Sequence, residues 1–355
     1  TWITREDFLR IAAAGLDSVR LPFGYWLFEE QSDAPFMVGG GRELLAQALD
    51  WASEAGLQVV LCLHSAPGFQ TGHQACGRED PGWRPAQWDV PATLRVIRDV
   101  ASTFAGHPAV AGFAVVNEPA SSIPLGVLLG FYSDAIRTIR EAGMAKDDVA
   151  ILLPLYQRRF SKEMAGHLPC EFAAENNVIF DVHLYQCFGD WWQSLPLGEH
   201  LSRATSGDGH YPSVQEIEAR GYRVCVSEWS LRLSTWAEGS PVHDEWEGMT
   251  GHERSSVIKA FGENQMNQFD SRASGGWFFW TWRVDGAASA EGEAWWSLEE
   301  SLNRGWIHIG EREEPGNVTW DNDSSTTRWH PVCGTAAVGR PWSDDAAQPA
   351  GAIFR

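Results

Sequence analysis

Apolar runs of strand length alternate with helical patterns along most of the chain, and this alternation constrains the fold more than any other feature. Because a helix separates each pair of successive runs, the strands need crossover connections and should lie parallel. The pattern predicts repeated βα units around a parallel sheet. Seven runs read as strands: DSVRLPFG, LQVVLCLHS, VAGFAVVNEP, VAILLPLY, NVIFDVHLY, YRVCVSEWS and GGWFFWTW.

The expected helices begin before the first of these strands. Thr4 should open a helix with Asp7 as its capping-box partner, and Gly15 should end it. Further helices are expected over residues 42–56, 91–104, 124–142 and 251–269. Seven strands preceded by a helix predict a (β/α)8 TIM barrel whose first strand would lie upstream of Thr1. The alternative, an open doubly wound sheet, usually carries a Gly-rich phosphate turn, and no GxGxxG or GxxxxGK[ST] occurs.

The chain of 355 residues is long enough to bury one large core, and no Pro-, Gly- and Ser-rich linker divides it. We therefore expect one catalytic barrel domain over residues 1–310. Residues 311–355 are polar and irregular, and we expect them to form a peripheral tail. There is no apolar run of about 18 residues that would span a membrane.

Composition narrows the choice of partner. The formal net charge of −20 argues against nucleic acid, which would need a clustered positive surface. The 19 Trp residues suit neutral ligands such as sugars, which stack on exposed aromatic faces. None of the six Cys residues has CxxC spacing, so a zinc site is not expected. We expect no cofactor. Cys62 and Cys225 fall in apolar strand patterns and should be core residues, while the other four could form disulfides or stay free.

Polar residues fall at the ends of the predicted strands, where a parallel barrel opens into a shared active-site mouth. They are His64, Asn117, Glu118, His183, Tyr185, Glu228 and Trp280, and Arg20 lies within the first strand. If the third and sixth visible strands are barrel strands four and seven, Glu118 and Glu228 face each other across this mouth. Paired carboxylates there suit glycoside hydrolysis, in which one acts as general acid and the other as nucleophile or base.

The two carboxylates need different environments for this chemistry. We expect Glu118, beside Asn117 and among aromatic residues, to stay protonated as the acid. Glu228 should stay ionised as the nucleophile, with Arg20, His183 and Tyr185 as its neighbours. Trp280 either stacks on a sugar ring or fills the barrel interior, and Phe188 either lines the entrance or packs within its loop.

Three other classes of protein are alternatives to a glycosidase. A metal hydrolase could use His64, Asp181 and His183, but no HxH or HExxH pair accompanies them. A serine hydrolase would need a GxSxG turn, which the chain lacks. A non-catalytic sugar-binding barrel needs aromatic residues and hydrogen bonds but no acid and nucleophile pair, so the two Glu residues favour an enzyme.

The sequence resembles glycoside hydrolase family 5, and within it the fungal-type exo-β-1,3-glucanases. The matching segments are DSVRLPFGYW, HSAPGFQTG, VNEP, HLYQCF, SEWS and GGWFFWTWR, in the family's order over about residues 2 to 310. The chain departs from the family at HSAPG, where HGAPG is usual, and at SEWS, where GEWS is usual. It also begins after the segment that carries the family's first strand, and the tail has no family counterpart.

The resemblance implies a retaining mechanism on a TIM barrel, with Glu118 as acid/base and Glu228 as nucleophile. It places Phe188 in an aromatic clamp at the next sugar, and it places these residues around the sugar being cleaved: Arg20, His64, Asn117, His183, Tyr185 and Trp280. The expected substrate is a β-glucan, most simply β-1,3-linked, with a β-1,4-endoglucanase (cellulase) as the alternative. We expect a monomer that is extracellular or associated with the cell wall.

Overall fold

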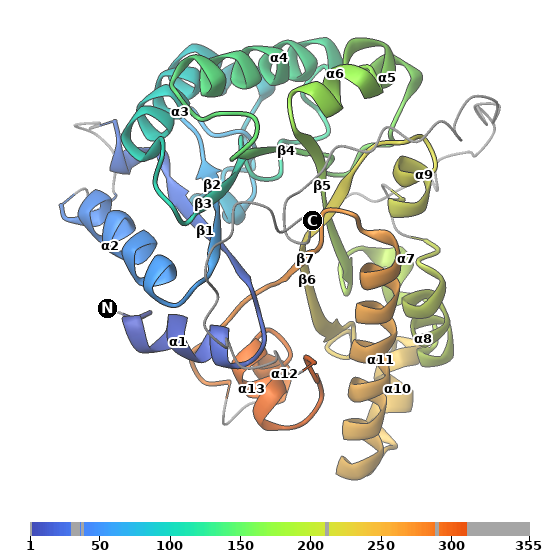
Figure 1. Cartoon of the computed structure of the whole chain (residues 1–355). Helices are drawn as coiled ribbons and strands as arrows, with labels where there is room; N and C mark the ends of the chain where they lie inside the picture. The colour runs from blue at the N-terminus through green and yellow to red at the C-terminus, as the bar shows by residue number, and fades with distance from the viewer. Residues whose placement is uncertain (1, 30–35, 37–38, 210–212, 288–290, 311–355) are drawn as a thin grey trace. The chain divides into compact units, whose positions relative to one another are not determined.

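The computed structural model of the chain describes residues 2–29, 36, 39–209, 213–287 and 291–310 (Figure 1). They form two compact units, residues 2–181 with 309 and 310, and residues 182–308. The first unit contains α1 (Arg5–Ala13), β1 (Ser18–Gly24), η1 (Tyr25–Leu27), α2 (Gly41–Glu54), β2 (Gln58–Ser65), η2 (Gln74–Cys76), η3 (Pro85–Gln87), α3 (Val90–Phe104), β3 (Val110–Ala114), α4 (Leu125–Glu141), β4 (Ala150–Pro154), α5 (Lys162–His167), α6 (Cys170–Glu175) and the start of β5 (Val178–Gln186). The second contains the end of β5, α7 (Asp190–Gln193), α8 (Leu197–Ser206), α9 (Val214–Glu218), β6 (Val224–Leu233), α10 (Pro241–Glu247), α11 (Gly251–Arg272), β7 (Trp277–Phe279), α12 (Glu291–Ala294) and α13 (Leu298–Asn303).

The strands follow one another through the sheet in chain order, from β1 to β7. Successive strands from β1 to β5 pair in parallel, and so do β6 and β7. All seven predicted strands are present within the described residues, and helices connect them as the sequence pattern requires. Helices α1, α2, α3, α4 and α11 occupy the five predicted helical stretches, each within a few residues of its expected ends. The predicted parallel α/β fold class is therefore confirmed.

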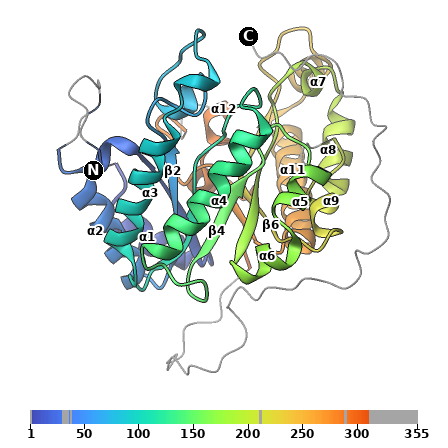
Figure 2. The same cartoon turned by 90° about the horizontal axis from the view of Figure 1, so that it is seen from above.

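Helices α2, α3 and α4 cover the outer face of the first strands (Figure 2). Helix α3 shows how the sequence specifies this arrangement. The Asp89 side chain caps its start by accepting a hydrogen bond from the amide of Ala92 at 2.9 Å. Val96, Val100 and Phe104 recur every four residues and are all buried, so one face of the helix is apolar and packs inward.

Strand β3 packs tightly between its neighbours. A Cβ atom on Gly112 would lie 2.9 Å from Val60 of β2 and 3.4 Å from Leu152 of β4. Side chains of both flanking strands therefore fill the space that a larger residue would need. Close packing fixes the position of β3, and with it the position of the residues that follow.

Strand β3 ends at Ala114, earlier than the run VAGFAVVNEP predicts. The next residues still bond to both neighbouring strands: the Val115 amide donates to Leu152 at 3.2 Å, and the Asn117 amide to Leu63 at 2.9 Å. These bonds continue to Asn117, and the next residue, Glu118, has a φ of +41°, outside the extended range.

Trp229 lies at the centre of the second unit. It is fully buried on β6 and makes edge-on contacts with Phe269 of α11 and with Trp277 and Phe279 of β7, at ring-centroid distances of 5.4, 5.4 and 4.9 Å. Aromatic contacts of this kind add to the energy of burial itself. They hold β6, β7 and α11 together.

The cysteines divide into two groups. Cys170, at the start of α6, is disulfide-bonded. Among the described residues, Cys62, Cys76, Cys187 and Cys225 are buried thiols that form no disulfide. Burial raises the pKa of the Cys76 and Cys187 thiols. The prediction that Cys62 and Cys225 are core residues is confirmed.

Two further expectations concern the extent of the catalytic domain with its C-terminal tail, and the presence of a membrane-spanning helix. The expected tail over residues 311–355 lies outside the described residues, and the single catalytic domain over 1–310 stays a prediction. No helix in the described part of the chain combines the length and the hydropathy needed to cross a bilayer.

His200 makes the stability of the second unit sensitive to pH. The side chain is fully buried in α8, its Nδ1 lies 3.0 Å from Gln186 Oε1, and its ring stacks on Trp192. Burial lowers the pKa of His200 from 6.5 to about 4. Between these pH values the unfolded chain binds a proton at this side chain and the folded chain does not. The contribution of neutral His200 is therefore present above pH 6.5 and is lost as the pH falls towards 4.

We predict that replacing His200 with Gln removes this pH dependence. Between pH 7 and pH 5, the free energy of unfolding of the wild type should fall by about 2 kcal/mol more than that of His200→Gln, as urea denaturation would measure. His252→Gln, at an exposed histidine of α11, is the control and should behave as the wild type does. Equal pH dependence in wild type and His200→Gln would contradict the prediction.

Candidate active site

Four polar residues of the first unit, Arg20, His64, Gln70 and Asn117, form a connected group that we call the Asn117 cluster. Arg20 Nη2 donates to Asn117 Oδ1 at 2.7 Å, and Asn117 Nδ2 lies 3.3 Å from His64 Nε2. Because the amide oxygen accepts from Arg20, the amide nitrogen donates to His64, whose Nε2 must then be unprotonated. The cluster fixes both the orientation of the Asn117 amide and the tautomer of a neutral His64.

Gln70 holds the backbone of this cluster in place. The side chain is fully buried in the loop after β2, where Nε2 donates to the carbonyls of His64 and Asn117, each at 2.8 Å. Its Oε1 accepts from the Ala66 amide at 3.0 Å. One side chain thus ties the end of β2 to the segment that follows β3.

Glu118 follows Asn117 and has an unusual backbone. Its φ of +41° lies in the left-handed region, which costs a residue other than glycine about 1 kcal/mol or more. The flanking residues Asn117 and Pro119 are buried, whereas Glu118 is partly exposed. The surrounding structure therefore imposes this conformation and presents the carboxylate at the surface of its unit.

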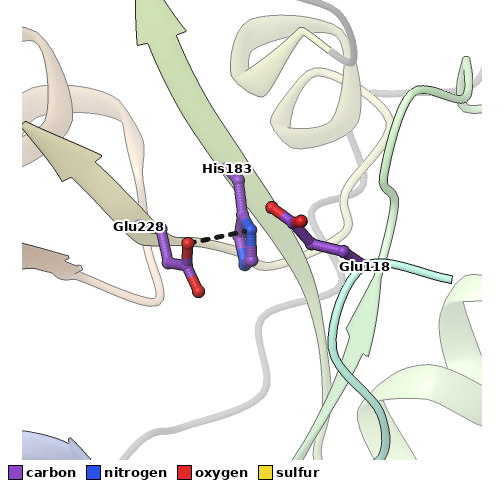
Figure 3. Close-up of side chains that lie close together, drawn as sticks. All are labelled: Glu118, His183 and Glu228. Atoms are coloured by element: carbon purple, nitrogen blue, oxygen red, sulfur yellow. Dashed lines mark ion pairs between the residues drawn. The ribbon is translucent and has the colours of Figure 1, made fainter. Parts of the chain in front are cut away.

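The second unit contains a group of four residues that we call the Glu228 cluster: His183, Tyr185, Ser227 and Glu228. Tyr185 Oη donates to Glu228 Oε2 at 2.9 Å. His183 Nδ1 lies 3.4 Å from the same oxygen (Figure 3). The other ring nitrogen of His183 lies 3.1 Å from Ser227 Oγ. Glu228 is 5% exposed, so its carboxylate is a buried acceptor that depends on donors from β5.

Aromatic residues adjoin the Glu228 cluster. The ring of Tyr185 contacts Phe188 and Trp296 at centroid distances of 5.4 and 5.6 Å, and Phe188 and Trp296 lie 6.0 Å apart. Phe188 is 45% exposed. An aromatic surface beside a buried carboxylate can bind the apolar face of a sugar.

The predicted residues fall into both units. Arg20, His64 and Asn117 come together in the first unit, and His183, Tyr185 and Glu228 in the second. Glu118 belongs to the first unit, so its pairing with Glu228 stays a prediction, as does the expected place of Arg20 beside Glu228. Trp280 follows β7 directly and is partly exposed, with its amide donating to the Trp229 carbonyl at 2.8 Å.

Sequence reasoning did not identify Gln70 or Trp296 as part of the site. Gln70 stands in HSAPGFQTG, where nothing in the pattern distinguishes a buried bridging amide from a solvated loop residue. Trp296 follows Trp295, and only this pairing of large aromatic residues could have drawn attention to it.

The chain is similar to known proteins over most of its length. Residues 2–286 match the family model for cellulase (glycosyl hydrolase family 5). The glucan 1,3-beta-glucosidase of Blumeria graminis is 31% identical over 317 residues, which cover 81% of this chain and 70% of that protein. A probable glucan 1,3-beta-glucosidase A of Aspergillus fumigatus is 29% identical over 339 residues, covering 86% of this chain and 74% of that protein.

Solved structures agree on the fold. The rutinosidase from Aspergillus niger matches with a TM-score of 0.60 at 16% identity, covering 86% of this chain and 83% of that one. The Pseudomonas stutzeri endoglucanase Cel5A matches with a TM-score of 0.51 at 16% identity, covering 87% and 86%. At this identity the likeness concerns the fold alone, and it confirms the predicted (β/α)8 class.

We predict that Gln70→Leu destabilises the chain by about 3 kcal/mol, because it removes three hydrogen bonds, those to the His64 and Asn117 carbonyls and that from the Ala66 amide. Urea denaturation would measure the loss. Gln74→Leu is the matched control, since Gln74 is exposed in the same loop, and it should change stability by less than about 0.5 kcal/mol. Similar stabilities of the two variants would show that the bridge contributes little.

Proposed function

Because the chain belongs to the cellulase family, glycosyl hydrolase family 5, we propose that it cleaves β-1,3-linked glucan with retention of configuration at the anomeric carbon. The observation that carries this proposal is the buried Glu228 carboxylate, which accepts a hydrogen bond from Tyr185 and faces His183. Donors to a carboxylate favour its ionised form, and an ionised carboxylate is what the nucleophile of a retaining glycosidase requires.

In the proposed reaction Glu228 and Glu118 act on one glycosidic bond. A Glu228 oxygen attacks the anomeric carbon and forms a glycosyl ester, while Glu118 transfers its proton to the departing glycosidic oxygen. Glu118, now ionised, takes a proton from water, which attacks the same carbon and releases Glu228. The two displacements together preserve the β configuration.

The remaining predicted residues would bind the sugar. Asn117, held by Arg20 and His64, has a fixed amide that suits a sugar hydroxyl beside Glu118. Trp280 would stack on the sugar being cleaved. Exposed Phe188 would contact the next sugar.

The relatives' names support the β-1,3 linkage, since both are glucan 1,3-beta-glucosidases by name. A β-1,4-endoglucanase remains the second candidate, because a solved structure with the same fold is titled an endoglucanase.

We also propose that the protein works outside the cell or at the cell wall. The disulfide at Cys170 supports this location, because disulfides persist mainly in oxidising compartments. The expectation of a monomer stays a prediction.

We predict that Glu228→Ala lowers kcat at least about 10⁴-fold on an aryl β-glucoside. Azide should restore turnover by entering the space of the lost carboxylate and should give the α-glucosyl azide. Glu118→Ala should instead keep the first step with a good leaving group, and azide should then give the β-glucosyl azide. Proton NMR of the products distinguishes the two anomers, and full activity of either variant would refute its assigned role.

We predict that the full chain hydrolyses laminarin at least about tenfold faster than carboxymethylcellulose, since the proposed site serves β-1,3 linkages. Release of reducing sugar measures both rates. The reverse preference would favour the β-1,4-endoglucanase, and activity on neither polymer would contradict the glucanase proposal.

A further inference from the structure

Ser227 and Glu228 are consecutive residues of β6, yet both lie against the same imidazole. Ser227 Oγ is 3.1 Å from His183 Nε2, and Glu228 Oε2 is 3.4 Å from His183 Nδ1. In a regular strand successive side chains point to opposite faces, so they could not both reach one ring. The local backbone must therefore depart from regular geometry.

The pairing of β6 with β7 shows this departure. Val226 pairs with Trp277, and Trp229 with Phe279, so three steps along β6 correspond to two along β7. One extra residue in β6 is a β-bulge, and it falls at Ser227 and Glu228. The bulge turns both side chains towards His183.

We propose that Ser227 is a positioning residue for the nucleophile and that it acts through His183. This inference rests on the proposed function, in which Glu228 attacks the anomeric carbon. The Ser227 hydroxyl lies against the imidazole that faces Glu228.

The chemistry of the hydroxyl explains why serine suits this place. If His183 is neutral, a proton on Nδ1 points at the carboxylate, and Nε2 then needs a donor, which the Ser227 hydroxyl supplies. If His183 is charged, Nε2 becomes a donor and the same hydroxyl accepts. The opposite neutral tautomer would set the Nδ1 lone pair against the carboxylate. The carboxylate thus favours a proton on Nδ1, and the Ser227 hydroxyl gives Nε2 a hydrogen-bond partner in either charge state.

Burial makes the contact difficult to replace. Ser227 is 1% exposed, and the His183 and Glu228 side chains are 4% and 6% exposed. An alanine at position 227 would leave His183 Nε2 in a buried space without this hydroxyl. The ring would then be free to reorient, and the carboxylate would lose part of its support.

The test measures the nucleophile's own step. With 2,4-dinitrophenyl 2-deoxy-2-fluoro-β-glucoside, attack by Glu228 forms the glycosyl ester and expels dinitrophenolate without help from a general acid. In Ser227→Ala the maximal rate constant of inactivation should fall about tenfold, while the concentration for half-maximal rate stays within about twofold. A merely structural role would not separate these two quantities.

Ser230→Ala is the matched control. Ser230 lies on the same strand and is 3% exposed, and its hydroxyl accepts from the Arg232 amide. This variant should be inactivated at the wild-type rate. In a His183→Ala background, Ser227→Ala should change the rate by less than about twofold, because the residue through which it acts is gone.

The outcomes separate the two proposals. Wild-type chain that acquires no fluoroglucosyl label on Glu228, as peptide mass spectrometry would detect, would contradict the proposed function itself. Wild type and Ser227→Ala labelled at equal rates would overturn only the role of Ser227. An equal loss in Ser230→Ala, or an undiminished effect without His183, would also overturn it.

Discussion

Parallel strands bring their carboxyl ends to one edge of a sheet, and the polar chemistry of this chain depends on that constraint. A polar group at the end of a buried strand needs partners, and the adjacent strand is the nearest source. Glu228 of β6 accepts from Tyr185 of β5, and Asn117 after β3 is held by His64 of β2 and Arg20 of β1. The same sheet geometry thus builds both clusters from residues far apart in the sequence.

The two clusters satisfy their buried groups in different ways. The Asn117 cluster is a network of side-chain amides. Gln70 donates hydrogen bonds to the carbonyls of His64 and Asn117, and the Asn117 side chain lies between the Arg20 guanidinium and the His64 imidazole. The Glu228 cluster is built around an anion and supplies it with a phenol and an imidazole. Cleavage of a glycosidic bond needs both a rigid neutral group that orients the sugar and a carboxylate that hydrogen-bond donors hold in place.

The sequence predicted the strands, five helices and the polar residues at strand ends, because apolar periodicity and capping are local signals. It did not predict that β3 ends at Ala114, since the apolar run continues through Val115 and Val116 without a break. Nor could it show the bulge at Ser227, because SEWS reads as an ordinary strand until its pairing with β7 is known. The role of Gln70 could not be predicted for a similar reason, because the Asn117 carbonyl that accepts its hydrogen bond lies 47 residues away in the chain.

The distribution of cysteines has a consequence for how the chain survives oxidation. Disulfide exchange requires a thiolate that can reach another sulfur. Cys62, Cys76, Cys187 and Cys225 are each at most 1% exposed, and burial disfavours the thiolate at Cys76 and Cys187. Once folded, the chain can therefore hold four reduced thiols beside the disulfide of Cys170 without scrambling. Wrong disulfides can form only before these strands and loops pack. The yield of native protein therefore depends on whether the chain folds before its cysteines are oxidised.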